Sequence, residues 1–476
     1  MLRMPKQRLH PLILVNYFLG SLINWTVIFV VVVNVHFIRE IPAPQLLSLL
    51  VAIAIVTSLA RYWLFTFEIG DQALTINSGL IFRKQLHIPY DRIQTVQTKR
   101  WFYMIPFGLE AVIIETAGKS GDDGDAQLPM VKVAVYQELL RRQHAGSAIS
   151  EVASVSPVSV ETSEGTAYKI NARDLNVYAL TSLGIAPIIL GLIYAYSKFS
   201  DVIPREWLSR AISSVQHAEW LMLVTFILGV LIVGTILSYV QIVLRYYGFT
   251  VTRQRNQIVT RRGLFQRRTV TSDLDRVQAI VVKQSVLRQL FQLATVQTVL
   301  ASTLSDDEES EMVVMPVLRT DQVWTVMPQF LPWLPTSQPV ITAIPWLGQW
   351  RMIRNAVAVA MIPVVGWVIV ARATAGWSLL LPVIALFLGR YAGQHTGIGL
   401  VADYLVAQEG SLFSRTLTLV PKKRIQAATI QQSIWMKRVG LAHLAVSVRS
   451  GDAEKKVTVR YLPVKVARQY YEWYRA

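Results

Sequence analysis

The side chains of this chain that could perform chemistry are few and scattered. There is no cysteine, and the seven histidines stand singly along the sequence rather than at metal-ligand spacing. Thiolate metal sites and cysteine nucleophiles are therefore excluded. The sequence contains no phosphate-binding loop, HExxH, GxSxG or dinucleotide-binding motif. We accordingly expect no catalytic residue, no metal and no cofactor, and we predict that the protein is not an enzyme.

Arginines, in contrast, recur at fixed spacing in three segments that align with one another. The segments read GLIFRKQLHIPYDRIQTVQ from Gly79, GLFQRRTVTSDLDRVQAIV from Gly263 and SLFSRTLTLVPKKRIQAAT from Ser411. Each has an arginine three residues after its first leucine, a second arginine nine residues further on, and another leucine seventeen residues beyond that. This repetition predicts three copies of one structural unit. The spaced positions are Arg83, Arg92 and Leu109, then Arg267, Arg276 and Leu293, then Arg415, Arg424 and Leu441.

Two roles are open to these basic residues. Arginine and lysine beside a membrane can bind lipid phosphate, although a solvated strand face would look the same in sequence. Candidates for lipid or phosphate binding are Arg83, Lys84, Arg267, Arg268, Arg415, Lys422, Lys423, Lys437 and Arg438. Only the third copy is strongly basic, so its PKKR segment at 421–424 is the leading candidate for an anionic-lipid contact. The positions that repeat most faithfully we predict to be structural anchors: Arg92, Arg276, Arg424, Gly79, Gly263, Leu109, Leu293 and Leu441.

The elements that carry these residues have the pattern of strands. In each copy, apolar residues alternate in short runs such as FEIGDQALTI and AVIIETA, and Gly, Asn and Asp interrupt the runs. Each copy then ends in a helix-like stretch, for example KVARQYYEWYR near the C-terminus. We therefore predict three small β-barrels or curved sheets, each closed by a C-terminal helix.

Composition places these units in a membrane protein. The chain is 53% hydrophobic and 16% charged, with a mean hydropathy of +0.39. Residues 9–38, 41–60, 175–197, 220–244, 355–371 and 373–389 carry no Asp, Glu, Lys or Arg. We read these runs as six transmembrane helices in three hairpins, which makes the fold class an α+β membrane protein. The formal charge of +17 then indicates anionic membrane lipids rather than nucleic acid as the partner.

The predicted order of segments follows from these patterns. Basic residues precede the first apolar run, so we expect a multi-pass protein of the cell membrane with cytoplasmic N- and C-termini. The segments are a first helix pair at 9–65, a first β-rich domain at 66–145, a Ser-rich linker at 146–172, a second helix pair at 173–245, a second domain at 246–331, an interfacial Pro/Trp linker at 332–352, a third helix pair at 353–392 and a third domain at 393–476.

The three segments with their helix pairs resemble a known family, the bacterial pleckstrin-homology-like (PH-like) domain of the second type, as arranged in YdbT-like membrane proteins. The likeness covers nearly the whole chain. It implies a PH-like β-barrel with a capping helix, no assigned reaction, a smaller single-domain relative as partner, and a link to tolerance of membrane-active peptides. The third copy departs from the pattern because Lys423 stands where the other copies have Asp91 and Asp275.

Three functions fit these observations. We favour a non-enzymatic membrane scaffold that associates with itself or with a smaller PH-like relative and contributes to envelope protection or antimicrobial-peptide tolerance. A lipid or peptide transporter would instead need a continuous polar groove between the helix pairs. A module that only binds anionic lipid would depend on the basic third copy.

Overall fold

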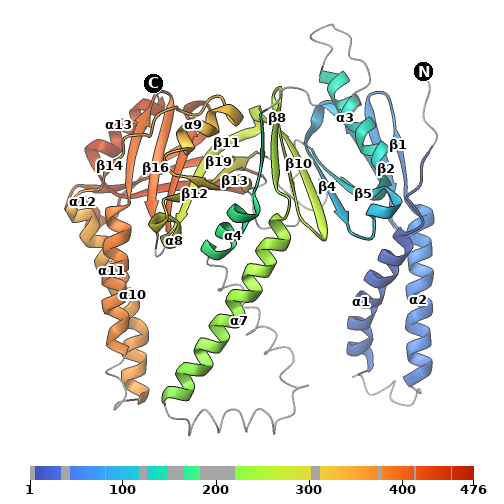
Figure 1. The fold of residues 1–476 in the computed structure, drawn as a ribbon, viewed down its shortest axis with the longest axis horizontal. Coiled ribbons are helices and arrows are strands. Elements are labelled where there is room, and N and C mark those ends of the chain that lie inside the picture. Colours follow the sequence, from blue (N-terminus) through green and yellow to red (C-terminus); the bar gives the residue numbers. More distant parts are fainter. Residues whose placement is uncertain are drawn as a thin grey trace.

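In the computed structural model, three β-rich domains stand in a row and long helices project from them toward one side (Figure 1). Domain 1 comprises residues 66–147, domain 2 residues 250–330 and domain 3 residues 397–475. The two chain ends lie over opposite ends of the row (Figure 1). The structure describes residues 6–33, 43–80, 82–116, 126–147, 166–182, 220–301, 311–371, 378–411, 414–451 and 453–475.

Domain 1 follows a pair of packed helices, α1 (Ile13–Val33) and α2 (Ala43–Leu64). Its first three strands form one antiparallel sheet, and a single 3-10 turn then leads to three further strands and a closing helix. The elements are β1 (Thr66–Ile69), β2 (Ala73–Ser78), β3 (Lys84–Pro89), η2 (Tyr90–Arg92), β4 (Ile93–Trp101), η3 (Ile105–Phe107), β5 (Leu109–Thr116), β6 (Ala126–Lys132) and α3 (Val133–Ser147).

Domain 2 repeats this order. Its elements are β8 (Thr250–Gln254), β9 (Gln257–Arg262), β10 (Gln266–Asp273), η5 (Leu274–Arg276), β11 (Val277–Ser285), α8 (Val286–Leu290), β12 (Leu293–Leu300), β13 (Glu311–Arg319) and α9 (Val323–Phe330). It follows β7 (Ala167–Lys169), α4 (Ala172–Thr181) and the long helix α7 (Trp220–Tyr246). The short strand β7 pairs with β8 at the edge of the domain.

Domain 3 repeats the order once more. It follows β14 (Thr342–Ala343) and the packed helices α10 (Trp346–Ala371) and α11 (Leu380–Gln394). Its elements are β15 (Gly397–Val401), β16 (Tyr404–Gly410), β17 (Ser414–Pro421), η7 (Lys422–Arg424), β18 (Ile425–Gln431), α12 (Ile434–Lys437), β19 (Leu441–Ser450), β20 (Ala453–Pro463) and α13 (Val464–Arg475). The predicted threefold β-rich repeat with a C-terminal helix therefore agrees with the structure.

Two recurring glycines make the hairpin before the third strand of domains 1 and 2. Gly79 and Gly263 have φ angles of +112° and +108°, in the region that side chains avoid. A Cβ at Gly79 would lie 1.9 Å from the carbonyl oxygen of Phe82, and one at Gly263 would lie 2.0 Å from that of Gln266. In domain 3 the corresponding residue is Ser411, whose backbone N–H donates to the carbonyl of Ser414 at 2.8 Å.

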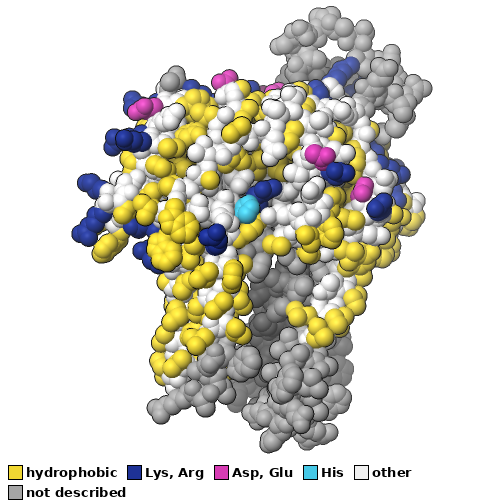
Figure 2. Space-filling view, turned by 60° about the vertical axis from the view of Figure 1, so that its left-hand side comes forward, with side chains coloured by type: hydrophobic (Ala, Val, Ile, Leu, Met, Phe, Trp, Pro, Cys, Tyr) yellow, Lys and Arg dark blue, Asp and Glu magenta, His cyan; other side chains and the backbone are white. Residues whose placement is uncertain are grey.

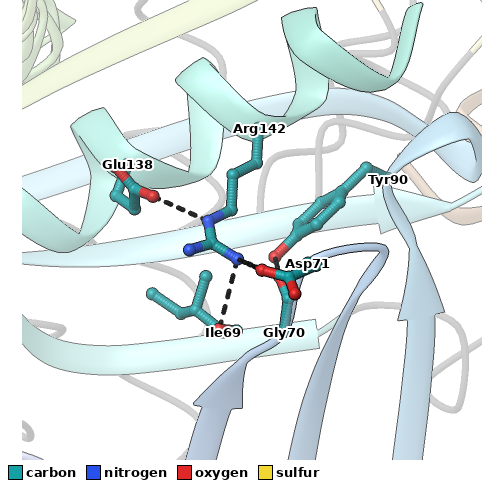
Figure 3. Close-up of polar contacts among 6 residues, drawn as sticks. All are labelled: Ile69, Gly70, Asp71, Tyr90, Glu138 and Arg142. Carbon is teal, nitrogen blue, oxygen red and sulfur yellow. Dashed lines mark hydrogen bonds and ion pairs between the residues drawn. The ribbon is translucent and has the colours of Figure 1, made fainter. Parts of the chain in front are cut away.

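The closing helix of domain 1 is fastened to the first hairpin by Arg142 (Figure 3). Its Nη1 donates to the carbonyl of Gly70 and lies 3.2 Å from the carboxylate of Asp71, while its Nε donates to Glu138 at 2.6 Å. The hydroxyl of Tyr90 donates to the same Gly70 carbonyl at 2.7 Å. One guanidinium thus connects α3, the β1–β2 turn and, through Gly70, the η2 turn.

The prediction of six transmembrane helices is wrong. Within the described residues one helix, at Trp346–Ile369 of α10, is both long and apolar enough to cross a membrane. Three further apolar helical segments are shorter, at Ser48–Leu64, Leu231–Tyr246 and Leu380–Gln394. A charge-free run shows low polarity but not where a helix begins and ends. The 15 residues of α11, for example, rise only about 22 Å, less than a bilayer core of about 30 Å. Of the first helix of the second predicted pair, over 175–197, residues 183–197 lie outside the described residues.

Candidate functional site: the seams between domains and the surface beside the helices

Neighbouring domains are joined by strand pairing, in two junctions that we call seams. Strand β4 of domain 1 pairs antiparallel with β10 of domain 2, and β11 of domain 2 pairs antiparallel with β17 of domain 3. Each seam fuses parts of two domains into one seven-stranded sheet, with the orders β6-β5-β4-β10-β9-β8-β7 and β13-β12-β11-β17-β16-β15-β14. The three domains therefore form one continuous structure rather than separate domains joined only by linkers (Figure 1).

The second seam also exchanges core residues between domains. Successive residues of a strand point to opposite faces of a sheet. Ile280 and Val282 of β11 pack in the core of their own domain 2, whereas Ala279 and Val281 pack in the core of domain 3. In return, Leu419 of β17 packs in the core of domain 2. Each core is therefore completed by its neighbour, so neither domain can separate without exposing apolar surface.

The first seam is more polar than the second. Thr95 and Gln97 of β4 occupy the positions of Ala279 and Val281 and are 1% and 3% exposed. Nε2 of Gln97 is buried and has no hydrogen-bond partner among the described residues. Burial of a polar atom without a partner costs free energy, so the first seam is the weaker of the two per residue.

Side chains reinforce the second seam at both of its ends. Arg415 donates to Oε1 of Gln284 from Nε at 3.0 Å and also from Nη2. At the other end, Nη2 of Arg424 donates to the carbonyl of Asp275.

A half-buried carboxylate from domain 2 adds an ion-pair cluster beside this seam. Glu311 of β13 lies 2.6 Å from Nζ of Lys283 and also contacts Nζ of Lys455 from domain 3. Burial favours the neutral carboxyl group, but the charges and hydrogen bonds of Lys283 and Lys455 outweigh it and lower the pKa of Glu311.

The basic residues predicted to bind lipid lie in five different places. Arg267 and Arg268 stand opposite Arg100 and Lys99 in the first seam, and Arg415 lies in the second. Lys422 and Lys423 lie in η7, directly after β17. The opposite end of β17 is near the helices, because it follows Gly410, whose N–H donates to Thr396 just after α11. The eight residues of β17 put Lys422 and Lys423 about 26 Å from the helix ends. Lys437 and Arg438 follow β18 beside the start of α10, while Arg83 and Lys84 lie exposed at the start of β3.

The predicted anchor residues occupy equivalent places in all three copies. Arg92, Arg276 and Arg424 each end a one-turn 3-10 helix before the first strand of the second sheet. The first residue of each turn donates its backbone N–H to the preceding hairpin: Tyr90 to Gln72 at 3.2 Å, Leu274 to Asn256 at 2.8 Å and Lys422 to Asp403 at 2.8 Å. Leu109, Leu293 and Leu441 begin equivalent strands, and the residue before each, Gly108, Gln292 or Gly440, has positive φ.

The surface that surrounds the helix ends is apolar in every domain. The loops that follow β4, β11 and β18 expose large hydrophobic side chains, namely Phe102 and Phe107, then Leu290 and Phe291, then Ile434 and Trp435. Hydrogen bonds place the β9–β10 turn and the segment after β18 near the helices, since the Leu264 N–H donates to the carbonyl of Leu244 in α7 and Nη2 of Arg351 in α10 donates to the carbonyl of Trp435. Figure 2 shows hydrophobic side chains at the base of the domains and along the projecting helices.

A pocket of about 680 Å³ opens on this surface in domain 3. Nδ1 of His443 accepts the backbone N–H of Tyr461 at 3.0 Å, and burial, then the charge of Arg460, lowers the pKa of His443. Arg438 lies beside the pocket with its guanidinium 5.4 Å from the Trp435 ring centre. No lining residue is acidic, so the pocket attracts anions. The lining residues are Arg351, Arg354, Gln431, Gln432, Ser433, Trp435, Met436, His443 and Tyr461.

Sequence reasoning missed a buried arginine in domain 2. Arg288 of α8 is 7% exposed; its Nη1 donates to Thr295 at 2.6 Å and its Nη2 to Ser182 at 2.7 Å. Its guanidinium also lies 4.6 Å from the ring centre of Tyr178 in α4. Burial lowers the pKa of Arg288. The arginine thus fixes the segment before α7 to domain 2, and no arginine stands at the equivalent position of the other copies.

Comparisons with known proteins agree with the threefold architecture. A family model described as Bacterial PH domain matches residues 16–146, 181–328 and 341–476. The chain is 28% identical over 460 residues to the UPF0699 transmembrane protein YdbT of Bacillus subtilis (strain 168), an alignment that covers 94% of this chain and 92% of the relative. The likeness to a transmembrane protein supports membrane association of this chain. With three matches that together span most of its length, the chain belongs to the bacterial PH domain family.

Proposed function

We propose that this protein is a membrane-bound scaffold whose three PH-like domains act as one rigid platform on the membrane surface. The observation that carries this proposal is the pair of seams, because shared sheets and exchanged core residues hold the domains in fixed relation. The apolar loops around the helix ends would rest against the lipid surface, and the opposite surface would be free for other proteins. The biological role of this scaffold would be protection of the envelope, including tolerance of membrane-active peptides.

Engineered disulfides in the seams test the rigid platform, and the absence of native cysteine removes any background. Thr98 and Thr269 face each other in the first seam, so cysteines at both positions should be joined within one chain by mild oxidation in membranes. Thr98 with Gln85 is the control, since Gln85 occupies in domain 1 the position that Thr269 occupies in domain 2. Failure of the 98/269 pair would refute a platform, because flexible domains would not hold the two strands in register.

The biological output is tested by breaking a seam. Val281→Asp places a charge in the core of domain 3, so we expect a strain carrying this variant to become as sensitive to a membrane-active peptide as a strain without the gene. A protein that protects the envelope without an intact platform would leave the seam variant as tolerant as wild type, provided that the variant remains in the membrane.

The proposed orientation places all three domains in the cytoplasm. Residues 6–10 contact domain 1, with Gln7 N–H donating to Phe67 at 2.8 Å, so the N-terminal region lies on the same side of the helices as α13. A single cysteine at Lys423 should react with a membrane-impermeant maleimide in inverted vesicles and not in intact cells. Labelling in intact cells would reverse the orientation.

A second candidate function, binding of an anionic lipid headgroup, is supported by the basic pocket of domain 3. Arg351 and Arg354 line it without an acidic neighbour, beside the apolar loops. The double variant Arg351→Glu/Arg354→Glu should retain less phosphatidylglycerol than wild type when the full chain is purified in mild detergent and its bound lipid is counted by native mass spectrometry. Lys422→Glu/Lys423→Glu makes the same charge change before the opposite end of β18, whose seven residues span about 23 Å up to the pocket residue Gln431, and equal loss in both variants would exclude a specific site.

A further inference from the structure

Every domain presents the same two strand edges, and within the described residues no strand pairs with the two outermost edges of the row. One edge is the third strand of the first sheet, namely β3, β10 or β17, and the other is the first strand of the second sheet, namely β4, β11 or β18. The seams use β4 with β10 and β11 with β17. Strands β3 and β18 remain as outer strands of three-stranded sheets, in the orders β1-β2-β3 and β18-β19-β20. One chain therefore carries both halves of a third seam.

The two existing seams have the same register. Val270 stands opposite Gln97 in the first seam and Thr418 opposite Val281 in the second, and each pair occupies the same repeat positions. The same rule applied to the open edges places Leu86 of β3 opposite Thr429 of β18. It also places Gln85 opposite Ile430, the positions held by Thr269 and Thr98 in the first seam.

Strand β18 lacks the features that protect an edge strand. Its sequence, IQAATIQ, contains no charge and no proline, which natural proteins commonly use to block edge pairing. Ala427, Thr429 and Gln431 are exposed, although residues in the same places on β11 are buried or half-buried. Tyr474 of α13 donates to the carbonyl of Gln426 at 3.3 Å, just before the part of the strand that would pair. Among the residues that the structure describes, no strand pairs with the rest of this edge.

Side chains at the open edges repeat a contact of the second seam. There, Arg415 of β17 donates to Gln284, whose own amide donates to the carbonyl of Leu293 at 2.9 Å. At the open edge, the amide of Gln432 donates to the Leu441 carbonyl at 2.8 Å in the same way. The equivalent of Arg415 on the other open edge is Arg83, and both Arg83 and Gln432 are exposed.

The arrangement of the helices permits a further repeat. Passing along the row from domain 1 to 2 and from 2 to 3 leaves the helices projecting to the same side (Figure 1). A second chain added by the same strand pairing would therefore keep its helices in the same membrane. Such a contact joins two different surfaces, so it extends the row or closes it into a ring.

We propose that β18 of one chain pairs antiparallel with β3 of a second copy, in the register of the existing seams, so that the protein assembles head to tail in the membrane. This inference rests on the proposed platform, because only domains held in register present the two edges in a repeating geometry.

The test uses single-cysteine chains that carry different tags and are co-expressed in the same membrane. One chain carries Gln85→Cys and the other Ile430→Cys; mild oxidation should give a reducible product of twice the 53.6 kDa chain mass, containing both tags. Each variant expressed alone should give no such product. Moving the second cysteine to Gln431, whose side chain points to the other face of the strand, should sharply reduce it. A chain with cysteines at Thr98 and Thr269 reports the platform in parallel.

Charge variants of β18 complete the test. Thr429→Lys places a charge inside the expected seam and should abolish the 85/430 product, whereas Gln426→Lys adds the same charge to the same strand outside the pairing segment and should leave it. The inference is overturned if the 98/269 disulfide forms but no 85/430 product does, or if Thr429→Lys leaves the product unchanged. A product that contains one tag and a different protein would assign the edge to another partner and also overturn it. If the 98/269 disulfide itself fails, the platform is refuted and the head-to-tail contact falls with it.

Discussion

The exchange of core residues across the second seam can be tested with two neighbouring valines. Val281 is fully buried in the core of domain 3, whereas Val282, the next residue of β11, is 5% exposed and lies in the core of domain 2. Replacement of either by alanine removes two methyl groups, worth about 1.6 kcal/mol of transfer free energy, and the cavity left behind brings the cost to about 2 kcal/mol. The two substitutions are chemically identical and adjacent, so each controls for the other.

The effect should appear in different domains. A cost of about 2 kcal/mol raises the equilibrium for local opening about 30-fold, which hydrogen exchange measures directly. We expect Val281→Ala to accelerate exchange in β19 and β20 of domain 3, and Val282→Ala to accelerate it in β12 and β13 of domain 2. If both variants loosened domain 2 alone, or both domains equally, the account of one strand serving two cores would be refuted.

Three further predictions concern single positions. Glu311→Gln should lower the free energy of unfolding by about 2 kcal/mol, because it weakens the contacts with two lysines. Since folding lowers the pKa of Glu311, the contribution of this residue to stability is present above pH 4.5 and is lost as pH falls. Thermal unfolding of the variant should therefore depend less on pH below 4.5 than that of wild type. Folding also lowers the pKa of His443, so the contribution of His443 to stability is present above pH 6.5 and is lost as pH falls below that value. His443→Gln should therefore flatten the pH dependence of the melting temperature below pH 6.5. An unchanged slope would contradict the lowered pKa of His443. Gly263→Ala should destabilise domain 2 by about 2 kcal/mol or more and lower its melting temperature, because the added Cβ would lie 2.0 Å from a carbonyl oxygen, whereas Gly229→Ala, with open space at its Cβ, should not.

Much of the fold within one copy could be predicted from the sequence, because the signals are local. Alternating apolar residues indicated strands, and the recurrence of Gly79 and Gly263 indicated structural anchors, which the structure places in hairpins at positive φ. The recurrence of Arg92 and its equivalents indicated structural anchors, which the structure places at the end of a short turn between the two sheets. Each of these signals depends on only a few neighbouring residues, so the repeat itself shows them three times.

The seams could not be predicted in the same way. Pairing between strands is made by backbone hydrogen bonds, and these are available to every residue except proline, so the alternating pattern of β4 does not show whether a neighbour pairs with it. For the same reason the sequence did not show that Arg267 and Arg415, predicted as candidates for binding lipid phosphate, lie along a seam. One signal available in the sequence was a repeated Gln–Ser pair at the end of a seam strand. Gln284 and Gln432 are each followed by a serine, and these serines cap α8 and α12.

The two seams differ in a way that bears on how further copies would associate. Within one chain, the connecting segments keep β4 and β10 at high effective concentration, so even the polar first seam, with its unpaired Gln97 amide, can remain closed. The open edges resemble that polar seam, since β3 offers Gln85 and His87 and β18 offers Thr429 and Gln431. Without a covalent connection, such a contact depends on the concentration of the protein in the plane of the membrane. Head-to-tail assembly should therefore be reversible and should increase with expression level, whereas the apolar second seam stays closed at any concentration.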